Sequence, residues 1–373
     1  MVKTVVILGA SFGGLHVAHA ILKKHNADIK VILVNKSTHF YWNLASVRAI
    51  IPDQIKDSQI FKPLDQALLG YQPASYELII GTATAANFDN RVIEIRVSDG
   101  SVRSVTYDQL VLATGARPAD ETAPWKASGS YEDVLESLHQ TAGRVVQAEH
   151  IVVGGAGGTG VEVAGELGCE FGKTKKIILL SSGPTLLGGD SVASAAASEL
   201  KKLNVTIRYG SRVTETRETP DGKTELVLAD GQTITTDLYL PTTGLIPNTD
   251  YIPAKHLSAD STYRSVLVDE YLRVEGAKDV WACGDIVSKP RAGFFITQKQ
   301  AASVAKNVWA ALAGQEPAVA KGPPVDIFAC AVGRNRGAGR LNSIKLPSFM
   351  VWLAKGRTLG MQMMHGYMDG SIA

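Results

Sequence analysis

Two stretches of this chain share one order of apolar and polar positions. In the first, the apolar run TVVIL (Thr4–Leu8) is followed by a glycine-rich turn, a segment with helical spacing, and a second apolar run, IKVILVN (Ile29–Asn35). The same order recurs 146 positions later, from His150 to Ser181. A β-branched run, a turn, a helix and another such run are typical of a βαβ unit. The pattern therefore predicts an α/β protein with two Rossmann-like units.

The segments after each unit predict antiparallel hairpins and further buried strands. Residues 76–115 alternate apolar and polar positions, with Asp-Asn and Asp-Gly turns, and end in the apolar run DQLVLATG. Residues 205–240 repeat this alternation, and Asp279–Val287 predicts one more strand before a long helical pattern. We expect a first domain built from 1–118 and 241–311, a second domain, 119–240, inserted into it, and a small C-terminal subdomain, 312–373.

Each predicted unit has a glycine-rich turn at the start of its helix. The free N–H groups and the positive end of the helix dipole suit a pyrophosphate at such a turn. One turn of this kind can be purely structural, but two in register indicate two dinucleotides and electron transfer between them. The candidate binding residues are Gly9, Ala10, Ser11, Phe12, Gly13 and Gly14 in the first turn and Gly155, Gly157, Gly158, Thr159 and Gly160 in the second.

Neither unit has the acidic residue that usually accepts a hydrogen bond from the adenosine ribose at the end of its second strand. Asn35, followed by Lys36, stands there in the first unit, and Ser181, followed by Ser182, in the second. An amide oxygen can still accept from a ribose, while Lys36 either supplements that contact or is simply solvated. The missing acid also leaves nothing to repel the 2′-phosphate of NADPH, and no arginine follows the two serines. We therefore expect the second unit to accept both NADH and NADPH.

Composition and charge exclude several other classes of protein. The 373 residues carry a net charge of +2 and no long Lys/Arg block, which counts against nucleic-acid binding. The three cysteines form no CxxC pair and no cluster has metal-ligand spacing, so we expect no metal site. No apolar run reaches about 18 residues, and the first strand begins almost at Met1, so we expect neither a membrane span nor a targeting peptide. These features favour a cytoplasmic protein.

The order of the motifs GxSxxG, ATG, GxGxxG, TGxxPN and CGD resembles that of the two-dinucleotide-binding flavoprotein disulfide-reductase superfamily, over nearly the whole chain. The segment HFYWNLASVRA (39–49) and the terminal AVGRNRGAGRLN and FMVWLAKGRTL resemble the ferroptosis-suppressor branch of the apoptosis-inducing-factor family, which is similar to type II NADH dehydrogenases. The resemblance implies a glutathione-reductase-like fold with FAD on the first unit, NADH or NADPH on the second, and electron transfer to a quinone. The cysteine pair of the disulfide reductases is missing after the first motif, so we expect no thiol–disulfide chemistry.

The resemblance also assigns roles to individual residues of this chain. The positions that match FAD contacts or the shared motifs are Arg48, Ala83, Thr114, Gly115, Gly244, Gly284 and Asp285. Asp285 can equally serve as a helix N-cap, and Arg48 can form a surface salt bridge. Glu162 matches a glutamate that faces the nicotinamide, although a glutamate in a first helical turn also suits the helix dipole. Lys355 matches a lysine near the mouth of the active site, so Glu162 and Lys355 are the catalytic candidates.

We therefore expect an FAD-dependent NAD(P)H oxidoreductase with a quinone-like acceptor. Two other functions stay open: a reductase of a small iron–sulfur protein, and a redox-sensing protein like apoptosis-inducing factor. If the segment from Leu346 is helical, Phe349, Trp352 and Leu353 form one apolar stripe, with Lys355 and Arg357 off it. Such a segment can lie peripherally on a membrane or lipid droplet, pack on the first domain, or form a homodimer interface.

Overall fold

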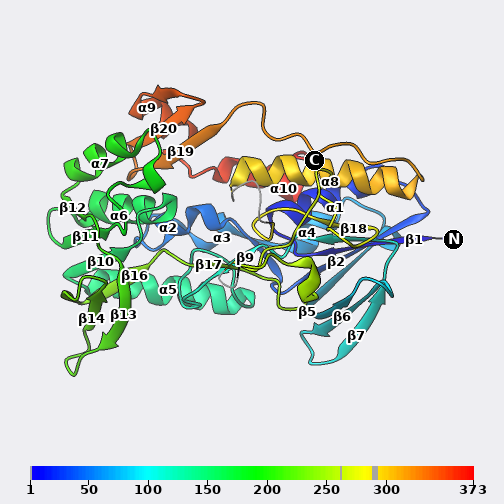
Figure 1. Ribbon diagram of the computed structural model, residues 1–373, viewed down its shortest axis with the longest axis horizontal. Helices are drawn as coiled ribbons and strands as arrows, with labels where there is room; N and C mark the ends of the chain where they lie inside the picture. Colours follow the sequence, from blue (N-terminus) through cyan, green and yellow to red (C-terminus); the bar gives the residue numbers. More distant parts are fainter. Residues whose placement is uncertain (1, 261–262, 288–292) are drawn as a thin grey trace.

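The computed structural model of the protein describes residues 2–260, 263–287 and 293–373, which form two α/β regions side by side (Figure 1). The larger sheet has seven strands in the order β18–β8–β1–β2–β5–β6–β7. Their bounds are β1 Lys3–Leu8, β2 Ile29–Asn35, β5 Tyr76–Asn87, β6 Val92–Val97, β7 Val102–Thr106, β8 Gln109–Leu112 and β18 Val280–Ala282. The strands β18, β8, β1, β2 and β5 pair in parallel, and β5, β6 and β7 form an antiparallel meander.

Helices cover one face of the larger sheet and bury its central strands. α1 (Phe12–Leu22) packs against α8 (Phe294–Leu312), and both run along this face (Figure 1). Val5, Val6 and Ile7 are fully buried, although their side chains point alternately to opposite faces of the sheet. A parallel strand covered on both faces needs such an unbroken apolar run, which is why TVVIL does not alternate.

The smaller region repeats this construction with a four-stranded parallel sheet in the order β12–β11–β10–β16. Its strands are β10 His150–Gly154, β11 Lys176–Leu180, β12 Val205–Arg208 and β16 Leu238–Pro241. Three helices accompany it: α5 Tyr131–Gln147, α6 Gly158–Phe171 and α7 Ala193–Lys202. A second meander consists of β13 Val213–Glu218, β14 Thr224–Leu228 and β15 Thr233–Thr236. The predicted α/β class with two Rossmann-like units is therefore confirmed.

Two chain crossings connect the regions. The short strands β9 (Ala116–Pro118) and β17 (Leu245–Pro247) pair antiparallel where the chain leaves the larger region and returns to it. After this return, β18 adds to the edge of the larger sheet beside β8. This connectivity is compatible with an inserted second domain, but the boundaries at 118, 240 and 311 remain a prediction.

Smaller elements complete the chain. Residues 39–75 contain the strands β3 His39–Tyr41 and β4 Phe61–Pro63 and the short helices α2 Ser46–Ala49, α3 Asp57–Ile60 and α4 Leu64–Leu68. The C-terminal part has the strands β19 Ile327–Ala331, β20 Gly337–Leu341 and β21 Ile344–Leu346, then the helices α9 Ser348–Val351 and α10 Met364–Met368. No helix in the described part of the chain is long and apolar enough to cross a membrane.

Arginines fix the C-terminal strands to the smaller region. Arg336 binds Glu199 of α7 at 2.9 Å, Arg340 binds Asp190 at 2.9 Å, and Arg334 pairs with Glu170 of α6. The last residues return to the larger region, where the Tyr367 carbonyl accepts a hydrogen bond from His19 Nε2 at 2.7 Å. The chain end therefore bridges both regions.

The C-terminal helix differs from the sequence prediction. The α-helix stops at Val351 and continues as a π-helical turn, Trp352–Gly356. Phe349 and Leu353 are 65% and 58% exposed, but Trp352 is half-buried, so the predicted three-residue stripe is only partly on the surface.

Candidate functional site

A cavity of about 720 Å³ lies at the carboxyl ends of β1, β2 and β8 and reaches the start of α6. This is the larger end of the size range for ligand pockets. Fourteen of the predicted cofactor residues line it: Gly9, Ala10, Ser11, Phe12, Gly13, Asn35, Lys36, Ala83, Thr114, Gly115, Gly158, Thr159, Gly284 and Asp285. The structure therefore brings together residues of both glycine-rich turns, which are far apart in the sequence.

The first glycine-rich turn is too crowded for side chains at two positions. Gly9 has a φ of +96°, and a Cβ there would lie 2.4 Å from the carbonyl oxygen of Ala113. A Cβ on Gly14 would lie 1.7 Å from the Gly9 carbonyl oxygen, so α1 can approach β1 only because residue 14 has no side chain. Ser11 is the N-cap of α1, but its side chain makes no capping hydrogen bond. The first-turn N–H groups of α1 therefore point to a cradle that suits a pyrophosphate.

Asn35 lines the cavity and also holds the turn in place. Its Oδ1 accepts a hydrogen bond from the Ala10 N–H at 2.9 Å, and its Nδ2 donates to the Ser37 carbonyl at 2.6 Å. The amide thus fixes the glycine-rich turn to the end of β2. The ribose contact expected for Asn35 stays a prediction, which now depends on the remaining lone pair of Oδ1.

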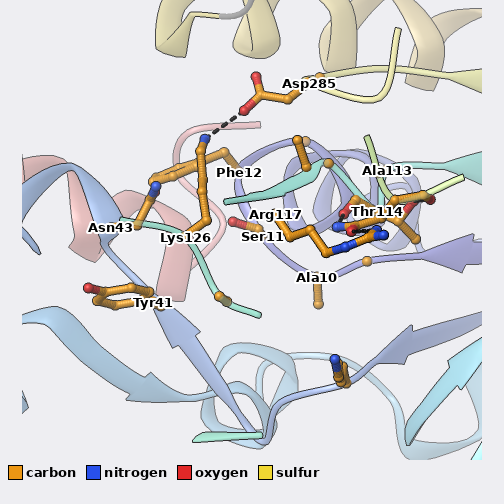
Figure 2. A pocket seen from close by; sticks show the side chains of 18 of the residues that line it. Ala10, Ser11, Phe12, Tyr41, Asn43, Ala113, Thr114, Arg117, Lys126 and Asp285 are labelled. Carbon is orange, nitrogen blue, oxygen red and sulfur yellow. Dashed lines mark hydrogen bonds and ion pairs between the residues drawn. The ribbon is translucent and has the colours of Figure 1, made fainter. Parts of the chain in front are cut away.

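A segment between the two regions covers one side of the cavity, and no sequence motif predicts it. Lys126 Nζ lies 2.6 Å from Asp285 Oδ2, and Figure 2 shows the two side chains reaching toward each other. Tyr41 donates to the Pro124 carbonyl at 2.9 Å, and Asn43 donates to the Trp125 carbonyl at 2.7 Å. No motif marks Lys126, because it lies in an irregular stretch that only folding brings to Asp285.

Arg48 is not among the cavity-lining residues, and its expected FAD contact stays a prediction. Its guanidinium is buried and binds Glu166 Oε1 of α6 at 2.7 and 3.0 Å and the Gly356 carbonyl at 2.7 Å. Glu166 Oε2 has no partner among the described atoms. Arg48 thus joins α2, α6 and the C-terminal π-helical turn, and its ion pair is buried rather than on the surface as the alternative reading had it.

The second glycine-rich turn repeats the close packing of the first. Gly155 has a φ of +106°, and a Cβ on Gly160 would lie 1.8 Å from the Gly155 carbonyl oxygen. Gly157 is the N-cap of α6, and Gly158 and Thr159 of its first turn reach the cavity. Gly155, Gly157 and Gly160 do not line the cavity, so their expected cofactor contacts stay a prediction. Gly244, with a φ of +76°, serves a turn near Ala119 and does not line the cavity either.

The Ser181 hydroxyl is less available for cofactor binding than the sequence suggested. Its side chain is 3% exposed and donates to the Thr185 carbonyl at 2.8 Å. Ser182 is exposed. Any direct contact between a nucleotide and this pair of serines would therefore fall to Ser182.

The two catalytic candidates form an ion pair. Lys355 Nζ lies 2.5 Å from Glu162 Oε1, which also accepts from the Ala331 N–H at 3.0 Å. Burial disfavours the charged amine, but the attraction of the Glu162 carboxylate, together with that of Cys330, outweighs this and raises the pKa of Lys355. Neither side chain lines the cavity itself, but Glu162 lies one helical turn after Gly158, which does. The pair therefore lies just behind the end of the cavity formed by the second unit.

No metal centre is found in the described ranges, since no group of three potential ligands occurs there. His16 and His19 lie on α1, but His19 is used in hydrogen bonds to Tyr71 and Tyr367. The three cysteines are free, and Cys283 and Cys330 are buried in different places. The residues present thus offer dinucleotide cradles but no dithiol.

Comparison with known proteins identifies the family of the chain. The model of the pyridine nucleotide-disulphide oxidoreductase family matches residues 3–310. The oxidoreductase ptaL of Pestalotiopsis fici is 37% identical, with 99% of this chain and 100% of that protein aligned. Ferroptosis suppressor protein 1 of Homo sapiens is 24% identical over 95% of this chain and 93% of its own length.

Solved structures support the same fold. The sulfide:quinone oxidoreductase of Aquifex aeolicus superposes with a TM-score of 0.77 at 16% identity, covering 100% of this chain and 92% of that one. This likeness concerns the fold. Together with the two glycine-rich cradles, the family match shows that the chain belongs to the pyridine nucleotide-disulphide oxidoreductase family, with apoptosis-inducing-factor-like relatives and with FAD and NAD(P)H as cofactors.

Proposed function

We propose that this NAD(P)H oxidoreductase transfers electrons through FAD to a quinone. The observation that carries the proposal is the Glu162–Lys355 ion pair of 2.5 Å behind Gly158 and Thr159. When bound, FAD would supply the redox chemistry, accepting hydride from NAD(P)H and delivering two electrons to the acceptor. The chain itself would supply position, charge and a proton.

Quinone reduction needs a proton donor, and the Glu162–Lys355 ion pair is a candidate for it. Reduction of a quinone by NAD(P)H consumes one proton besides the hydride, because the hydroquinone product carries two hydrogens. The Lys355 ammonium carries such a proton, and because its side chain lies behind the cavity wall, the proton would reach the quinone through a bridging water. Electron transfer to an iron–sulfur protein would need no such proton, so the pair favours the quinone over that alternative.

Apolar side chains also line the cavity. They are Leu44, Leu245, Phe294 and Phe328, together with Phe12. Phe12 also makes edge contacts with Phe40, Phe294 and Tyr367 at centroid distances of 5.2–5.4 Å. A planar quinone ring fits aromatic surroundings of this kind.

Steady-state turnover with a water-soluble ubiquinone analogue, a ferredoxin and oxygen as competing acceptors tests the proposal. We expect the quinone to be preferred, and Lys355→Met to lower quinone turnover by about 10²-fold, the usual size of a general-acid contribution. Anaerobic bleaching of the flavin by NADPH should persist in this variant. Lys345→Met, on exposed β21, is the matched control. Preference for ferredoxin, or undiminished quinone turnover without Lys355, would refute the proposal.

We also propose that the C-terminal subdomain contacts a membrane or lipid droplet surface. Its exposed apolar side chains are Ile327, Leu341, Ile344, Phe349, Met350 and Leu353. Ile327 directly precedes Phe328, so this surface adjoins a wall of the cavity. Lys355 is paired with Glu162 and is therefore not available to bind lipid headgroups.

Point variants test this better than a truncation, because Leu359, Met364 and Tyr367 are buried and a shortened chain would lose core packing. Phe349→Ser with Leu353→Ser should abolish co-sedimentation with anionic liposomes and leave turnover with a water-soluble quinone unchanged. Wild-type protein that never binds liposomes would exclude the membrane role. A concentration-dependent dimer that the variant disrupts would assign the same surface to a second copy.

A further inference from the structure

The ends of two neighbouring strands in the smaller sheet bring an arginine-containing segment beside the two serines. β11 and β12 pair in parallel, with Leu180 opposite Arg208. Beyond them the Ser181 N–H donates to the Arg208 carbonyl at 2.9 Å, and the Ser211 N–H donates to the Ser181 carbonyl at 2.8 Å. Gly210 continues this pairing by donating to Gly183 at 3.2 Å. These backbone hydrogen bonds therefore hold Arg208–Ser211 beside Ser181–Gly183, with the bonded residues 27 to 30 positions apart in the sequence, and Arg212 is the next residue of the chain.

In a Rossmann-like unit, this location is part of the dinucleotide-binding site. The end of the second strand is where the adenosine ribose lies, and an acid there binds its hydroxyls in enzymes that select NADH. Here the strand ends in Ser181 and Ser182, and no acid occurs at 181–183. Because the Ser181 hydroxyl already donates to Thr185, it is not the group that selects the cofactor.

The two arginines of the adjoining segment lack acidic partners. Arg208 donates to the neutral Gln232 Oε1 at 2.5 Å, and Arg212 is exposed. Asp230, on the same turn as Gln232, accepts a hydrogen bond from the Gln232 N–H. In the described ranges no ion pair joins either arginine to a carboxylate. By contrast, Arg217 on the next strand is paired with Glu215 at 2.8 Å.

We propose that Arg208 and Arg212 form a subsite for the 2′-phosphate of NADPH, so that the protein prefers NADPH to NADH. A phosphate dianion gains charge-assisted hydrogen bonds from guanidinium groups, and no acid at 181–183 opposes it. The sequence predicts that the second unit accepts both NADH and NADPH, because no arginine follows Ser182. The proposal replaces this with a preference for NADPH, because the neighbouring strand supplies the arginines. It rests on the NAD(P)H-binding half of the proposed function and is independent of the electron acceptor.

Calorimetric titration of the FAD-loaded protein with 2′,5′-ADP and with 5′-AMP tests the subsite without turnover. We expect 2′,5′-ADP to bind at least about tenfold more tightly, which is about 1.4 kcal/mol. Arg208→Gln and Arg212→Gln should each reduce this ratio, the double variant should bring it near one, and the affinity for 5′-AMP should not change. Arg217→Gln, in the same region but already ion-paired, is the matched control and should keep the ratio.

A second variant avoids disturbing the contact between Arg208 and Gln232. Ser182 is exposed, so Ser182→Glu places an acid beside the subsite without altering the core, and it should lower the affinity for 2′,5′-ADP selectively. Equal wild-type affinities for the two ligands, or a preference that survives in the double arginine variant, would overturn the proposal. Failure of both ligands to bind would also overturn it, because the adenosine site would then lie elsewhere. A wrong quinone assignment would appear only in the acceptor assay.

Discussion

Replacing Gly14 by alanine should remove FAD while leaving the rest of the fold intact. The new Cβ would lie 1.7 Å from the Gly9 carbonyl oxygen, whereas real Cβ contacts are essentially never under 3.0 Å. The start of α1 must therefore move away from β1 by at least 1.3 Å, the difference between these two distances. Such a shift takes the first-turn N–H groups out of hydrogen-bonding range of a pyrophosphate held by the other cavity walls.

The size of the effect follows from the lost hydrogen bonds. A hydrogen bond to a charged group contributes about 1.5–3 kcal/mol, so loss of two weakens FAD binding by about 3–6 kcal/mol. This corresponds to roughly 10²–10⁴ in Kd. Recovery of flavin fluorescence on dilution measures the affinity, and circular dichroism measures the fold.

Two other alanine variants make the test specific. Gly160→Ala puts the same clash, 1.8 Å from the Gly155 carbonyl oxygen, into the second turn, and should leave a yellow protein that NADPH reduces slowly. Gly143→Ala lies within α5 with no atom near the added Cβ, and should stabilise the protein by up to about 1 kcal/mol. If Gly14→Ala retained FAD with wild-type affinity, the turn would not be the pyrophosphate cradle.

Three further predictions concern charged and titratable groups. Arg48→Met leaves the Glu166 carboxylate buried without its partner and should destabilise the protein by about 3–5 kcal/mol in urea unfolding; an unchanged midpoint would show that the ion pair does not contribute. Burial lowers the pKa of His16 from 6.5 in the unfolded chain to about 4. Between these two pH values the unfolded chain binds a proton at His16 and the folded protein does not, so the protein is fully stable above pH 6.5 and loses stability as the pH falls toward 4. His16→Leu should flatten that pH dependence, by up to about 3 kcal/mol, and an identical pH profile in the variant would contradict the assignment. Lys126→Met removes the cation beside Asp285 and should speed FAD release in stopped-flow fluorescence, whereas unchanged release would mean that this contact does not retain the cofactor.

The local features of the fold could be predicted because they depend on neighbouring residues. An apolar run, a glycine turn and a helical period lie within about 30 positions, and they led directly to both βαβ units. The crowding at Gly9 and Gly14 follows from the same motif, since the helix must begin close to the strand. Most residues of the first turn accordingly line the cavity.

What could not be predicted depends on segments that are distant in the sequence. Lys126 meets Asp285 across 159 positions, and no local pattern marks the lysine. The ion pair between Arg48 and Glu166 joins residues 118 positions apart, and no local pattern indicates it. The position of Arg208 beside Ser181 arises only from parallel strand pairing. The partner of a charged side chain depends on the tertiary structure, so residue type alone does not predict it.

The edge position of β18 has a consequence for synthesis of the protein on the ribosome. Val280 of β18 pairs with Leu110 of β8, and these positions are 170 residues apart. At about 5–20 residues per second, translation needs on the order of 10–30 s to cover that distance. During this interval the β8 edge, whose Leu110–Leu112 are fully buried in the finished protein, has no neighbour and is open to strand pairing with other chains. Nascent chains arrested before β18 should therefore bind chaperones, whereas the finished protein, in which β18 covers this edge, should not.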